Sequence, residues 1–91
     1  MMPSELGEIR WNDLKNERLK RTRGVSFDEI LESNYLGIWN HPNRLFQKVM
    51  LFERKGYIWM VPFVREGDEV FLKTLYASRK YTKLYKRGEL I

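Results

Sequence analysis

Residues 71–88 read FLKTLYASRKYTKLYKRG, and this stretch predicts a strand that runs into a short C-terminal helix. Ser78 is the expected N-cap, because its hydroxyl can accept a hydrogen bond from a free N–H group of the first helical turn. Tyr81, Leu84 and Tyr85 have the i, i+3, i+4 spacing of an apolar helix face. The stretch therefore predicts a helix that packs its tyrosines and leucine against a sheet.

The same stretch is strongly basic. It has no acidic residue and six basic ones, namely Lys73, Arg79, Lys80, Lys83, Lys86 and Arg87. Arg79 and Lys80 fall in the first helical turn, where the helix dipole disfavours cations by a few tenths of a kcal/mol each. Selection for helix stability alone would place Asp or Glu there. Together with Lys73, these cations indicate either an anion-binding site or an ordinary solvated basic face.

The length and composition describe a small single domain. Ninety-one residues can bury one modest core, and we expect a tail over residues 1–8, a domain over 9–88 and a tail over 89–91. The absence of cysteine excludes disulfides and thiolate metal sites. The N-terminus lacks a signal-peptide pattern, and the longest apolar run, residues 57–64, is too short to span a bilayer. We expect a soluble, cytoplasmic protein with no membrane partner.

The net charge of +5 is concentrated in two blocks. Residues 10–23 carry six basic side chains against two acidic ones, and residues 71–88 carry six against none. Residues 24–70 between them are close to neutral, with five basic and seven acidic side chains. If the fold brings the two blocks together, they form one basic surface suited to a phosphate backbone or an acidic protein.

The first part of the chain predicts a strand and two helices. Ile9 and Trp11 fit a short strand, and a helix follows from residue 12 or 13 to about residue 23. Ser26 and Glu29 have the spacing of a capping box, in which each side chain bonds the backbone N–H of the other. The second helix should therefore begin after Ser26 and end near residue 34.

The second part predicts four antiparallel strands over residues 35–40, 45–54, 57–65 and 69–76. Residues 57–64 are apolar on both faces, so that strand should be central in the sheet. Pro62 has no N–H to donate and predicts a bulge or a break in the pairing. The element order is β-α-α-β-β-β-β-α, which describes an α+β domain.

His41 is the chain's only histidine and stands in the sequence NHPNR. A lone histidine cannot assemble a metal site without partners, and no phosphate-binding glycine loop, carboxylate pair or nucleophile elbow is present. We therefore expect no metal and no cofactor. Imidazole suits general acid–base work near neutral pH. The alternative is an ordinary turn histidine beside a proline.

One reaction suits these residue types, namely metal-independent cleavage of RNA by its own 2′-hydroxyl. Charge then builds on the phosphoryl oxygens, and positioned Arg and Lys donors stabilise it. Arg79 is the expected phosphate clamp because its guanidinium is a planar fork, and tyrosines can stack on an unpaired base or pack in the core. The expected catalytic group is Arg79, Lys80, Lys73, His41 and Arg44, and the expected nucleic-acid-binding group is Arg10, Lys15, Arg18, Arg23, Tyr76, Tyr81 and Lys83.

Several segments resemble those of BrnT-like toxins, over roughly residues 9–87. Residues 23–29, RGVSFDE, are similar to the family's K-H-G-V-S-F-E-E, and residues 77–82, ASRKYT, are similar to its S-A-R-K-A-T. The pair at positions 11 and 12 stands where the family often has W-D. A subgroup of these toxins is resembled by GY at 56–57, VPFV at 61–64 and FLKT at 71–74. The sequence departs from the family pattern at Asn12 and at Thr22-Arg23, where the family has K-H.

This resemblance implies the toxin of a type II toxin–antitoxin system with a RelE-like fold, a small antiparallel sheet with two N-terminal helices and one C-terminal helix. It implies a ribonuclease that blocks translation, a neutralising antitoxin of the ribbon-helix-helix type, and contact with operator DNA only through that antitoxin. Among site residues it extends to Arg79 and Lys80, and loosely to Lys73. The charge pattern alone also fits a non-catalytic module that binds RNA or an acidic protein.

Overall fold

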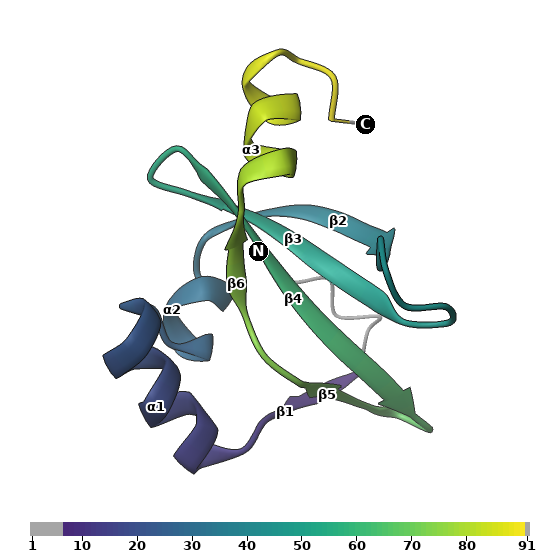
Figure 1. The fold of residues 1–91 in the computed structure, drawn as a ribbon. Helices are drawn as coiled ribbons and strands as arrows, with labels where there is room; N and C mark the ends of the chain where they lie inside the picture. The colour runs from purple at the N-terminus through teal and green to yellow at the C-terminus, as the bar shows by residue number, and fades with distance from the viewer. Residues whose placement is uncertain (1–6, 91) are drawn as a thin grey trace.

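One sheet of six strands organises the computed structural model, which describes residues 7–90 (Figure 1). The expected tails therefore fall largely on residues outside this range. Glu8 already belongs to the first strand, and Leu90 packs against a core cluster. In chain order the elements are β1 (Glu8–Arg10), α1 (Asp13–Arg23), α2 (Phe27–Leu31), β2 (Asn34–Asn40), β3 (Lys48–Arg54), β4 (Tyr57–Glu66), β5 (Glu69–Leu72), β6 (Tyr76–Ser78) and α3 (Arg79–Lys86).

β4 is the central strand, as the sequence predicted. The sheet runs β1-β5-β4-β3-β2, and β6 also pairs with β4. The α+β class, with two N-terminal helices and one C-terminal helix, is confirmed. The sheet is mixed rather than purely antiparallel, because β1 pairs with β5 in parallel. Five strands follow α2 instead of the expected four, so the observed element order also differs from the expected one.

The additional strand arises at Pro62. The segment expected to be one strand over residues 69–76 is divided, so that β5 ends opposite Phe63 and β6 begins opposite Met60. The backbone N–H of Lys73 donates to the Pro62 carbonyl oxygen at 2.9 Å. The N–H and C=O of one strand residue point to the same edge of the strand. Pro62 therefore lacks an N–H donor on the edge of β4 that its carbonyl oxygen faces, which is the edge that pairs with β5 and β6. The break predicted from the proline is thus confirmed, and it lies between β5 and β6.

The helices cover opposite faces of the sheet. Leu19 of α1 and Phe27 and Ile30 of α2 pack in a cluster with Met50 and Phe52 of β3. On the other face, Val49, Leu51, Ile58 and Met60 form a second cluster, against which Tyr81 of α3 packs. Figure 1 shows α1 and α2 together, away from α3. The basic surface expected from joining the two charged blocks is therefore not formed by the helices.

Two element boundaries differ by three residues from the sequence prediction, and the packed face of α3 differs as well. α2 ends at Leu31, three residues early, and β3 begins at Lys48 rather than at position 45. In α3 the face turned to the sheet is set by Tyr81 and Thr82, while Tyr85 is 38% exposed. The Thr82 hydroxyl accepts a hydrogen bond from the Ile58 N–H at 2.9 Å, which fastens α3 to β4.

The predicted capping box is present at the start of α2. Ser26 Oγ accepts from the Glu29 N–H at 3.2 Å, and the Ser26 N–H donates to Glu29 Oε1 at 3.0 Å. Lys20 Nζ donates to both carboxylate oxygens of Glu29 at 2.8 Å, which links α1 to α2. The hydrogen bond from Lys20, followed by that from the Ser26 backbone, lowers the pKa of Glu29 to about 2.

Glu29→Gln is expected to change how stability depends on pH. The folded-state pKa of Glu29 lies below its ordinary value of 4.5, so its stabilising contribution is fully present above pH 4.5 and is lost as the pH falls toward 2. In urea unfolding between pH 5 and pH 2, the variant should lose less stability on acidification than the wild type. Glu17→Gln, on the exposed side of α1, should follow the wild type. Equal pH dependence in wild type and Glu29→Gln would contradict the assignment.

Candidate functional site

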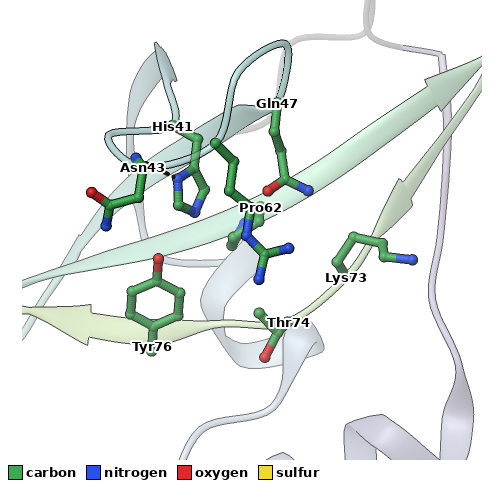
Figure 2. A pocket seen from close by; sticks show the side chains of 8 residues that line it. His41, Asn43, Gln47, Pro62, Lys73, Thr74 and Tyr76 are labelled. Atoms are coloured by element: carbon green, nitrogen blue, oxygen red, sulfur yellow. Dashed lines mark hydrogen bonds between the residues drawn. The ribbon is translucent and has the colours of Figure 1, made fainter.

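A cleft of about 330 Å³ opens beside β4, where the ladder along this strand is interrupted between β5 and β6. Three segments meet there, the loop after β2, the middle of β4 and the connection between β5 and β6 (Figure 2). Lys73 and Thr74, which follow the end of β5, form a wall of this cleft instead of continuing the strand. The lining residues are His41, Asn43, Arg44, Gln47, Pro62, Lys73, Thr74 and Tyr76.

His41 is held in one orientation by its own loop. Its backbone N–H donates to the Gln47 carbonyl oxygen at 2.8 Å, and its Nδ1 accepts a hydrogen bond from the Asn43 N–H at 3.0 Å. The neutral ring therefore carries its proton on Nε2, and Figure 2 shows the imidazole projecting into the cleft. In this state His41 is a hydrogen-bond donor to whatever occupies the cleft.

The charge of the cleft is entirely positive. Arg44 and Lys73 line it, together with neutral polar side chains and no Asp or Glu. Within the described range, neither cation forms an ion pair with a carboxylate. Two uncompensated cations and an N–H donor around one small space make a site that fits an anion, and a phosphate suits the planar fork of Arg44.

Tyr76 connects the cleft to the basic end of α1. The Tyr76 side chain packs against the second core cluster, and its hydroxyl points toward the loop that carries His41 (Figure 2). The guanidinium carbon of Arg23, the last residue of α1, lies 5.9 Å from the Tyr76 ring centroid. Arg23 is thus a residue of the first basic block that reaches the second one.

Arg79 and Lys80 do not line this cleft. Both are exposed in the first turn of α3, at the end of β6 opposite to Tyr76, about 10 Å away at the rise of a strand. Ser78 caps the helix as predicted, since its Oγ accepts from the Tyr81 N–H at 3.1 Å. The structure therefore brings His41, Arg44 and Lys73 of the expected catalytic group together and leaves Arg79 and Lys80 outside.

No protein-family model and no curated protein matches the chain. The structure is similar to the crystal structure of the Brucella abortus ribonuclease toxin BrnT, with a TM-score of 0.52 and 16% sequence identity. The match covers 79% of this chain and 96% of the other. This chain has the BrnT fold. The fold expected from the sequence resemblance is therefore confirmed.

On this BrnT-like fold, the expected nucleic-acid-binding residues are spread over the surface. Tyr76 lines the cleft, Arg23 lies against the Tyr76 ring, and Tyr81 packs toward the second core. Arg10 is engaged by Glu69 at 3.4 Å and by Glu8 at 3.6 Å, which offsets its charge. The other three are Lys15 and Arg18 on α1 and Lys83 on α3.

Three polar residues of the cleft were not predicted from the sequence, namely Asn43, Gln47 and Thr74. Asn43 contributes a backbone N–H, which any residue except proline could supply, so its identity carried no signal. Gln47 Oε1 is buried and has no hydrogen-bond partner in the described part of the chain. Thr74 follows Lys73 in the interrupted segment, and the break expected at Pro62 was the available signal for it.

Residues 7–90 contain neither a metal-binding cluster nor a helix that could span a membrane. No three His, Cys, Asp or Glu side chains in this range are grouped so that they could hold a metal ion. None of the helices in the range has the length and apolar character required to cross a bilayer.

Proposed function

We propose that this chain is the toxin of a type II toxin–antitoxin system and acts as a ribonuclease that cleaves mRNA and blocks translation. The observation that carries the proposal is the acid-free cleft that is lined by His41, Arg44, Lys73 and Tyr76. The similarity to the fold of a ribonuclease toxin supports the same reading. The reaction class follows from the donors, because cations and an N–H group stabilise charge that develops on a phosphoryl group.

In the proposed reaction, the ribose 2′-oxygen attacks the adjacent phosphorus and its proton passes to solvent water. The bond from phosphorus to the 5′-oxygen of the next nucleotide breaks, that oxygen takes up a proton from water, and the products are a 2′,3′-cyclic phosphate and a 5′-hydroxyl. Arg44 and Lys73 hold the non-bridging oxygens, and the Nε2–H of His41 donates to the same phosphate. The Asn43 N–H occupies Nδ1, so His41 acts here as a donor rather than as the base.

The other basic residues are proposed to guide the RNA strand toward the cleft. Arg79 and Lys80, at the far end of β6, would contact a phosphate further along the strand. Arg23 and Tyr76, whose side chains lie together, would hold the nucleotide beside the cleft. Lys15, Arg18 and Lys83 would add sequence-independent attraction that weakens with salt.

The proposed partner is a cognate antitoxin of the ribbon-helix-helix type, and operator DNA would be contacted only through it. Its toxin-binding segment should carry Asp or Glu, because it must neutralise the unpaired cations of the cleft. Antitoxin and RNA would then compete for one site in the cytoplasm.

The test is induced expression in a bacterial host with mapping of transcript ends. We expect growth arrest together with new 5′ ends in mRNA, both absent with His41→Asn, which keeps the backbone bond to Gln47 but removes the imidazole. RNA binding by the purified protein without arrest or new ends would contradict catalysis and favour the non-catalytic basic module.

A further inference from the structure

The tip of the loop after β2 exposes two large apolar side chains. Leu45 is 88% exposed and Phe46 is 101% exposed. Phe46 also has a φ of 64°, in the left-handed region that residues with a β-carbon rarely adopt. A fully exposed ring does not stabilise the fold by burial. Backbone strain of this kind typically occurs where a ligand is held.

This ring adjoins the cleft. A neighbouring hollow has Phe46 in its wall and shares His41, Arg44 and Gln47 with the cleft. Gln47, the residue after Phe46, closes the loop through its carbonyl oxygen, which accepts from the His41 N–H at 2.8 Å. The conformation that exposes Phe46 is thus the one that positions His41.

The surroundings of the ring are cationic. Arg44 and Lys48 flank the Leu45-Phe46 pair, and residues 40–48 contain no Asp or Glu. A flat aromatic face beside phosphate-binding cations is the combination that proteins use for single-stranded nucleic acids, in which bases stack on rings while cations follow the backbone. The chemistry therefore favours an unpaired nucleobase over an apolar protein segment.

We propose that Phe46 is a stacking platform for the unpaired base next to the phosphate held in the cleft, and that it sets which nucleotide is accepted there. This role rests on the proposed ribonuclease function. It adds a residue that neither the charge pattern nor the family resemblance indicates.

The test measures binding of 2′-O-methylated RNA pentamers, which lack the attacking hydroxyl, by fluorescence anisotropy. Phe46→Ala should weaken binding about tenfold, as expected for the loss of one base–aromatic stack. Phe46→Trp should bind as tightly as the wild type, whereas Phe46→Leu, which keeps the apolar character, should bind as weakly as Phe46→Ala. Leu45→Ala, at the neighbouring exposed position, should stay within about twofold of the wild type.

Pentamers with an abasic residue at each position in turn complete the design. At one position the abasic change should weaken wild-type binding and have no further effect on Phe46→Ala, because both changes remove the same stack. If Phe46→Ala binds and cleaves RNA as well as the wild type does, this result would overturn the stacking role alone. Unchanged RNA binding with lost antitoxin binding in Phe46→Ala would also overturn it, in favour of a protein contact. Failure of the wild type to bind any RNA would instead overturn the proposed function.

Discussion

Arg44→Ala is expected to lower the single-turnover rate of RNA cleavage by about 100- to 1,000-fold, the usual cost of removing one donor from a site that stabilises developing charge. The guanidinium lines the cleft together with His41 and Lys73, and no acidic residue lines it. The rate is measured with an excess of protein over a labelled transcript that contains a mapped cleavage site. Arg44→Lys should recover only part of the rate, because an ammonium group cannot make the paired contacts of the fork.

Arg79→Ala provides the matched comparison, since it removes the same side chain from the exposed start of α3. We expect it to weaken RNA binding and to reduce the slope of log affinity against log salt by about one, while the rate at saturating protein stays near the wild-type value. The reverse pattern, with a slow Arg79→Ala and an unaffected Arg44→Ala, would place the chemistry at α3 and contradict the cleft.

Phe27→Ala is expected to reduce the free energy of unfolding by about 3–5 kcal/mol, the range for truncating a buried phenylalanine. The side chain is 0% exposed, and its ring centroid lies 5.7 Å from that of Trp11. Its backbone N–H also donates to Asn16 Oδ1 at 2.7 Å, so α2 and α1 meet at this residue. A loss of this size is a large share of a typical domain's stability. Urea unfolding of both proteins measures it.

Phe46→Ala is the control for this prediction, because the same truncation is made at a fully exposed site. Its unfolding free energy should stay within about 0.5 kcal/mol of the wild type. If Phe27→Ala does not fold, Phe27→Leu should still show a measurable part of the loss. Equal and small effects at positions 27 and 46 would contradict the packing of α2 on the sheet.

Local chemistry allowed much of the fold to be predicted. Ser26 and Glu29 marked the start of α2 because a capping box involves only four consecutive residues. Pro62 marked the break in the sheet because its missing donor acts at its own position. The start of β3 was predicted three residues too early because of Leu45 and Phe46. An apolar pair before a strand has the same pattern whether it is buried or exposed.

The site was harder to predict because it depends on which strands are neighbours. His41, Arg44 and Lys73 line one cleft only because β4 pairs with β6 along one part and with β5 along another. The gap between these two pairings lies beside the loop after β2. Arg79 was correctly predicted to be a cation in the first turn of a helix. The sequence did not indicate that this turn lies at the opposite end of β6 from the cleft.

Binding of RNA in the cleft beside β4, between β5 and β6, can be observed residue by residue in an NMR titration of the labelled protein with a 2′-O-methylated oligoribonucleotide. Backbone amide shifts should change chiefly over residues 41–48 and 73–76, with smaller changes at the start of α3. Changes confined to α1, with the loop and residues 73–76 unaffected, would contradict the account.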